Sequence, residues 1–187
     1  MNSPFANIYL SLLQQIETLL VAPPGTSPAI SYIDLNYGQL DSSSRGSVSF
    51  PCVLIDFRDW EFEDLSLQAQ KAHGIITLKL ATSSYDDTSS ISPEATIESG
   101  IGVLDLEWQL YNALQGFRPA VAVDTGGSPT VQAQPMSRLY IISDNRHTGV
   151  RAREIAFTCA YTDYSAKQAE TIVPATINLT EEIDLSL

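Results

Sequence analysis

The feature that most constrains the fold of this sequence is an amphipathic segment over residues 4–21. Its apolar residues recur every three or four positions, and polar residues such as Gln14 and Glu17 stand between them. This spacing predicts a helix with one apolar stripe, which has to be buried against another element. The segment Ala22-Pro23-Pro24-Gly25 predicts the end of the helix. The apolar positions are Phe5, Ile8, Tyr9, Leu12, Leu13, Ile16, Leu19 and Leu20.

Short runs rich in β-branched and aromatic residues follow this helix and predict strands. The predicted strands cover residues 29–36, 50–57, 138–143 and 151–164. Residues 60–70 and 73–82 predict either one long bent strand or a pair of strands. The segment 144–149 between the last two strands is typical of a hairpin connection.

A second helical pattern covers residues 100–116, where Gly116 is a plausible helix stop. Two apolar stripes lie side by side in this pattern. The first consists of Ile101, Leu104, Trp108 and Tyr111, and the second of Leu106, Leu110, Ala113 and Leu114. We expect Trp108 in the core because it belongs to such a stripe. The polar segments 41–47, 83–99 and 119–135 predict loops.

The order of helix, strands, helix and hairpin predicts an α+β fold. We expect a mostly antiparallel sheet with two amphipathic helices packed on it, long loops and an extended C-terminal arm. Residues 1–168 should form a single domain. In the C-terminal arm, residues 169–187, apolar and polar residues alternate from Ala175 onward, which predicts strands that need a partner edge. The predicted core consists of Leu12, Leu13, Ile16, Leu104, Leu110, Val53, Ile55, Ile76, Leu78, Ile141 and Phe157.

The chain carries 22 acidic residues against 10 lysines and arginines, a formal net charge of −12. Such a surface repels phosphate backbones, so tight binding to DNA or RNA is not expected. Two interpretations stay open. Either the charge serves solubility alone, or it lines a passage through which nucleic acid slides without sticking. No apolar run approaches ~18 residues, so no membrane span is predicted.

The residues that could carry chemistry give no catalytic pattern. His73 stands at the start of a strand and His147 in a hairpin tip, and both are expected to be structural or surface histidines. Cys52 and Cys159 lie in apolar strand-like runs, which favours buried free thiols. We therefore predict no enzymatic function, no catalytic residue and no cofactor.

An acidic cluster is the one candidate for a metal site, and it is a weak one. It consists of Asp56, Asp59, Glu61, Glu63 and Asp64. The order DFRDWEFED matches no EF-hand loop, and Arg58 offsets part of the charge. A strand edge open to water is the favoured interpretation, so no metal ligand is predicted. Gly126-Gly127 lacks the lysine and hydroxyl residue of a phosphate-binding loop.

The order of the elements resembles that of small tail-terminator and tail-completion proteins of long-tailed bacteriophages. The segments that carry the resemblance, within residues 5–164, are FANIYLSLLQQIETLL, FPCVLIDF, AQKAHGIITLKLAT, IGVLDLEWQLYNALQGF and SRLYIISDNRHTGVRAREIAFTCAY. The resemblance lies in the pattern of elements and not in a diagnostic motif. It leaves the C-terminal arm outside.

The resemblance implies a structural protein of the virion tail that is assembled in the bacterial cytoplasm. It implies a homo-oligomeric ring, commonly a hexamer, that caps the tail tube and joins the head connector. DNA would pass through without tight binding, and no membrane is involved. The alternatives are a head–tail connector, a minor tail protein, or a small-ligand binding domain or enzyme that uses a long loop as a lid.

Overall fold

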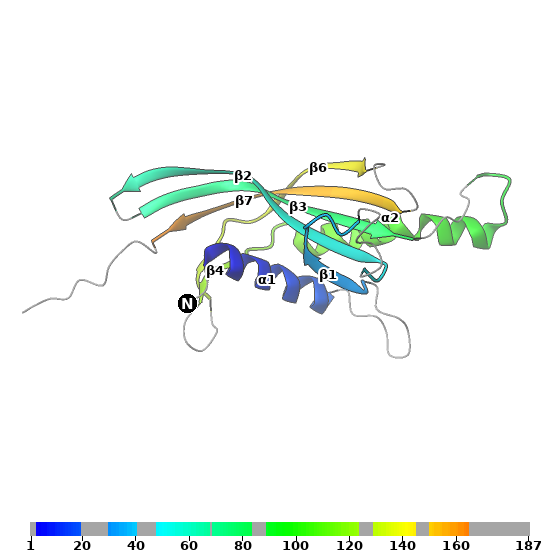
Figure 1. Ribbon diagram of the computed structural model, residues 1–187, viewed down its shortest axis with the longest axis horizontal. Helices are drawn as coiled ribbons and strands as arrows, with labels where there is room; N and C mark the ends of the chain where they lie inside the picture. Colours follow the sequence, from blue (N-terminus) through cyan, green and yellow to red (C-terminus); the bar gives the residue numbers. More distant parts are fainter. Residues whose placement is uncertain are drawn as a thin grey trace, which may run out of the picture.

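Two helices, a five-stranded sheet and a two-stranded sheet make up the described part of the chain (Figure 1). The computed structural model describes residues 3–19, 30–40, 48–67, 69–83, 89–123, 129–144 and 150–164. The elements are α1 (Pro4–Leu19), β1 (Tyr32–Leu35), β2 (Cys52–Ser66), β3 (Ala69–Thr82), α2 (Glu94–Leu114), β4 (Ala120–Val123), β5 (Pro129–Gln132), β6 (Ser137–Asp144) and β7 (Arg151–Asp163).

The larger sheet has the strand order β1-β2-β3-β7-β6. Strand β3 is central and pairs antiparallel with β2 from Ala69 to Ala81 and with β7 from Gln70 to Thr82. Strand β6 pairs antiparallel with β7, and only β1 runs parallel to its neighbour β2. The predicted α+β fold with a mostly antiparallel sheet is therefore confirmed.

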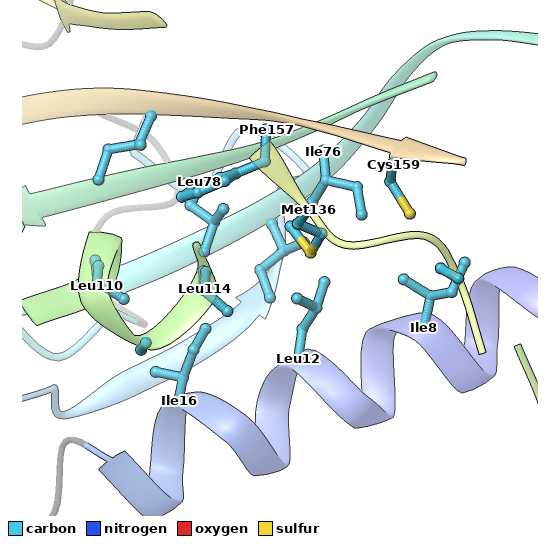
Figure 2. Packing of buried hydrophobic residues seen from close by; sticks show 14 of the residues in the cluster. Ile8, Leu12, Ile16, Ile76, Leu78, Leu110, Leu114, Met136, Phe157 and Cys159 are labelled. Carbon is cyan, nitrogen blue, oxygen red and sulfur yellow. The ribbon is translucent and has the colours of Figure 1, made fainter. Parts of the chain in front are cut away.

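Helix α1 packs across one face of the sheet (Figure 2). Ile8, Leu12 and Ile16 recur every four residues, so they lie on one side of the helix, and all three are fully buried. They belong to the same cluster as Leu78 of β3 and Phe157 of β7. The last turns of α2 bring Leu110 and Leu114 into that cluster as well.

Most of the predicted core is confirmed. Eight of its residues are buried in the main cluster: Leu12, Ile16, Val53, Ile55, Ile76, Leu78, Leu110 and Phe157. Leu13 and Ile141 are half-buried. The prediction for Leu104 is wrong, because half of this residue's surface (50%) is exposed. Leu104 belongs to the stripe of α2 that points away from the sheet, whereas its neighbours Val103 and Leu106 pack against the main cluster.

Three predicted boundaries are wrong. Helix α2 begins at Glu94, six residues before the expected start at residue 100. Pro93 is its N-cap, and the Glu94 carboxylate in the first turn interacts favourably with the helix dipole. Segment 119–135 contains the β4–β5 hairpin, since the apolar run at 120–123 has a partner strand. The strands expected at 50–57 and 60–70 form one strand, β2, which continues through a register shift beside Asp59 (φ 51°).

Other predictions are confirmed or lie outside the described residues. Residues 60–70 and 73–82 belong to two paired strands, so the pair and not the single bent strand is present. Gly116, with φ 79°, follows the C-cap of α2 and ends it as expected. Four predicted features lie outside the described residues: the helix end at 22–25, His147, Gly126-Gly127 and the C-terminal segment 169–187.

The burial of α1 can be tested with two leucines of the same helix. Leu12 is fully buried, whereas 47% of Leu10 is exposed. We expect Leu12→Ala to lower the free energy of unfolding by ~2–5 kcal/mol, because it leaves a cavity between helix and sheet. Leu10→Ala should change it by less than ~0.5 kcal/mol. Urea denaturation measures both, and equal midpoints for the two variants would contradict this packing.

Candidate functional site

Neither cysteine forms a catalytic pair with His73. His73 lies on β3 with Nε2 3.2 Å from Glu61 Oε2, and half of its side-chain surface is exposed. The next residue of β3, Gly74, pairs with Cys159 of β7. The Cys159 side chain points into the core on the helix side of the sheet (Figure 2). Since successive residues of a strand face opposite sides, His73 and Cys159 lie on different faces of the sheet.

Burial keeps both thiols protonated at neutral pH. It raises the pKa of Cys159 to about 12. Burial also raises the pKa of Cys52 to about 12, although a backbone hydrogen bond from Ala81 lowers it in part. Cys52 pairs with Ala81, at the far end of β3 from His73. Both cysteines are free and buried as the sequence predicts, and neither is a thiolate nucleophile in this state.

The acidic cluster is spread along the β2–β3 hairpin instead of converging on one point. Asp56 accepts a hydrogen bond from Arg58 Nε at 2.9 Å, and Asp64 accepts one from Gln70 Nε2 at 2.8 Å. Glu61, Glu63 and Asp64 are exposed, as a strand edge open to water requires. Within the described ranges, no group of three or more His, Cys, Asp or Glu residues is arranged to hold a metal ion.

A hollow of about 430 Å³ lies beside the His73–Glu61 pair. Asp59, Leu139 and Thr158 also line it. It is open to solvent, and its carboxylates and imidazole form a polar wall.

The face of the sheet away from the helices carries ion pairs with buried carboxylates that the sequence did not reveal. Arg58 Nη1 lies 2.9 Å from Glu154 Oε1, and Tyr140 donates its hydroxyl to the same oxygen at 3.3 Å. Burial lowers the pKa of Arg58, but its bond to Asp56 and the charge of Glu154 outweigh this, so the pKa is raised. Only 3% of the Glu154 side chain is exposed, so Arg58 and Tyr140 supply contacts that water cannot make with this carboxylate.

A second ion pair lies on the same face. Lys79 Nζ is 2.9 Å from Asp144 Oδ2, and both side chains are buried. Lys79 and Glu154 are register partners on β3 and β7, so the charges form one band across the middle strands. Buried, mutually paired charges specify how the strands align more than they add stability.

The first protruding surface is the arm, which we define as residues 57–67, 69–75 and 158–163, in β2 with the turn that follows it, β3 and β7. Pairing of β1 with β2 stops at Ile55, and pairing of β6 with β7 starts at Thr158, so the three strands continue past their neighbours. The arm extends beyond α1 at one end of the molecule (Figure 1). Phe62, Leu65 and Leu67, at its tip, are at least half exposed.

An aromatic cluster anchors the base of the arm. Trp60 packs edge to face on Phe5 of α1, with ring centroids 4.9 Å apart, and lies 5.7 Å from the ring of Tyr161. The Trp60 ring also covers Gly74, where an added Cβ would lie 2.5 Å from Trp60 Cδ2. Trp60 therefore packs within the protein.

The second protruding surface is the outer stripe of α2, which we define as Ile97, Ile101, Leu104 and Trp108. Its exposed fractions are 40% for Ile101, 50% for Leu104 and 58% for Trp108. The expectation that Trp108 lies in the core is therefore wrong. Trp108 stacks against Tyr111 at 5.2 Å between centroids, and the Arg138 guanidinium lies 4.0 Å from the centre of the Tyr111 ring. Figure 1 shows the N-terminal part of α2 extending beyond the sheet, at the end of the molecule opposite the arm.

Comparisons with known proteins assign no family. No family model matches the sequence, and no curated protein matches it. Among solved structures, a chain from "Virion of native gene transfer agent (GTA) particle" is similar at 11% identity and a TM-score of 0.49. The alignment covers 87% of this chain and all of the other. Within the described residues, no helix is long and apolar enough to cross a membrane.

The packing of Trp60 on Gly74 gives a matched pair of glycine variants. We expect Gly74→Ala to lower the free energy of unfolding by ~1–3 kcal/mol, because the new methyl group overlaps the Trp60 ring. Gly102→Ala, at a helical position with no atom within 4 Å of the new Cβ, should raise it by ~0.5–1 kcal/mol. Thermal denaturation followed by circular dichroism measures both. An unchanged stability of Gly74→Ala would mean that the Trp60 ring does not lie on Gly74.

The Arg58–Glu154 pair predicts the effect of removing a charge. Arg58→Met leaves the buried Glu154 carboxylate without its cation. We expect this to lower the free energy of unfolding by about 2 kcal/mol. This is below the figure for a fully buried pair because 34% of the Arg58 side chain is exposed. Lys71→Met, on the exposed arm, should change stability by less than ~0.5 kcal/mol.

The double variant Arg58→Met with Glu154→Gln separates the pair from other effects of the arginine. It should recover part of the loss, because no unpaired charge remains buried. A double variant as unstable as Arg58→Met alone would mean that the arginine acts through packing.

Proposed function

We propose that this chain is a structural protein of a phage virion, and within that class a tail terminator that caps the tail tube as a ring. The observation that carries the proposal is the exposure of large apolar side chains on two protruding elements, the arm and α2. Contiguous exposed apolar groups on a folded domain mark sites of protein–protein contact. The element order that underlies the resemblance supports the narrower class.

In this proposal the arm contacts a neighbouring copy. The β2 edge beyond Ile55 has no strand partner among the described residues, so its backbone groups offer hydrogen bonds to an added strand. The alternating C-terminal segment 169–187 of a neighbour supplies such a strand. A contact between two different surfaces of identical copies closes into a ring when the rotation is right.

Termination then follows from shape and not from chemistry. One face of the ring repeats the contacts that tube subunits make with each other, and the other face does not, so tube growth stops there. That second face is offered to the head connector. The net charge of −12 keeps DNA moving through the ring from adhering, so we expect no tight binding to duplex DNA at physiological salt.

Electron microscopy of particles from cells with a disrupted copy of the gene tests the proposal. Overlong tails are the expected result, because nothing would stop tube growth. Complementation with the intact gene should restore the length. Tails of ordinary length without heads would assign a joining role instead, and ordinary complete particles would exclude both.

Complementation with two variants tests the role of the arm. The double change Leu65→Asp with Leu67→Asp places charges on the arm tip and should fail to restore tail length. Leu10→Asp changes an α1 leucine of similar exposure, 47% against 55% for Leu65, and should restore it. Normal tails with the arm variant would remove the arm from the assembly contact.

A further inference from the structure

Helix α2 is unusual in its charge. Its 21 residues include Glu94, Glu98, Asp105 and Glu107, and none of them is Lys, Arg or His. Arg153 neutralises Glu107 with a distance of 2.6 Å between Nε and Oε2. The other three carboxylates are exposed.

These three carboxylates border the outer stripe. At 100° per residue, Leu104, Ile101 and Trp108 fall within a sector of about 60° on the helix surface. Glu94, Glu98 and Asp105 fall about 80–120° from Leu104 on the side of Ile101, so they form an acidic ridge along that border. The opposite border turns toward the core, where Leu110 and Leu114 are buried. The exposed surface is thus an apolar stripe with one acidic edge.

The C-terminal end of the stripe is held in place. Trp108 stacks on Tyr111, and Arg138 covers the Tyr111 ring, so the aromatic pair has support from β6. An exposed tryptophan fixed in this way loses little freedom on binding, which is typical of an interface anchor.

We propose that a basic amphipathic helix of a different protein docks on the outer stripe of α2. Its apolar side chains would cover Ile101, Leu104 and Trp108, and its lysines or arginines would lie along the acidic ridge. Apolar contact around a central tryptophan supplies most of the affinity in such interfaces. Opposite charges at the rim steer the encounter and select the partner.

A second copy of this chain fits the stripe poorly because it has little positive charge to offer. The described part contains seven lysines and arginines, and four of them already contact groups of their own chain: Arg58, Lys79, Arg138 and Arg153. Arg151 also has an interaction. With a net charge of −12 on each copy, contact at an acidic ridge is repulsive.

The chain's own C-terminal segment fits no better. Residues 169–187 contain Glu170, Glu181, Glu182 and Asp184 and no lysine or arginine. Their apolar positions could cover the stripe, but their carboxylates would meet those of the ridge. Charge therefore favours a basic partner over both alternatives.

Calorimetry with synthetic peptides and the full-length chain tests the proposal. The probe is an 18-residue helical peptide with a leucine stripe flanked by lysines, and its control has glutamates in place of the lysines. We expect the lysine peptide to bind and the glutamate peptide not to. Leu104→Gln with Trp108→Gln should weaken binding by roughly tenfold or more. Leu139→Gln with Ile142→Gln, on β6 at similar exposure, should leave it unchanged.

A charge variant keeps the test valid if the apolar variant fails to fold. Glu98→Lys with Asp105→Lys alters only exposed groups and should weaken binding of the lysine peptide several-fold at low salt. The difference should shrink as salt screens the charges. Circular dichroism confirms that each variant is folded.

Four results would overturn the proposal. Equal binding of both peptides would deny the role of charge, and unchanged binding by the Leu104–Trp108 variant would place the peptide elsewhere. A change in the mass of the protein alone caused by that variant, or tighter peptide binding after deletion of residues 169–187, would assign the stripe to a second copy or to the C-terminal segment. None of these results depends on the ring, because tail length tests that separately.

Discussion

The fold depends on the double pairing of β3. Its 14 residues hydrogen-bond to β2 on one side and to β7 on the other, so one strand sets the alignment of the whole sheet. Over its second half, residues 76–82, every residue is buried. Over its first half the same three strands continue past β1 and β6 and become the arm, of which α1 covers only the base. One strand thus joins a packed domain to a protruding surface, which makes the position of the arm depend on the core.

The two faces of the sheet are stabilised in different ways. On the helix face, α1 and the end of α2 bury apolar side chains, and cavities there are costly. On the opposite face a smaller apolar cluster, which includes Cys52 and Leu54, lies beside two ion pairs. These join Arg58 to Glu154 and Lys79 to Asp144 across strands. An error of one residue in alignment would leave these charges buried without partners, so the pairs favour a single register. A sheet with one register suits the structural role proposed above.

The sequence predicted the fold class, α1 and most of the core, because these follow from local spacing. It did not predict Glu154 as the partner of Arg58, since that contact depends on the pairing of strands far apart in the chain. The outer stripe of α2 shows a different limit. The spacing of apolar residues predicted two apolar stripes on that helix, but spacing alone does not indicate which of the two stripes packs against the sheet. Leu110 and Leu114 are buried, and Leu104 and Trp108 face solvent, because the second stripe turns toward the sheet and the first points away from it.

The central claim is that this protein works through contacts with other protein subunits. Light scattering of the full-length chain, alone and with tail tubes assembled in the same host, tests it most directly. The account predicts that the chain leaves the monomer mass of 20.4 kDa for a discrete multiple of it, commonly six, at least when tubes are present. A chain that remains at 20.4 kDa under both conditions, at every concentration, would contradict the account.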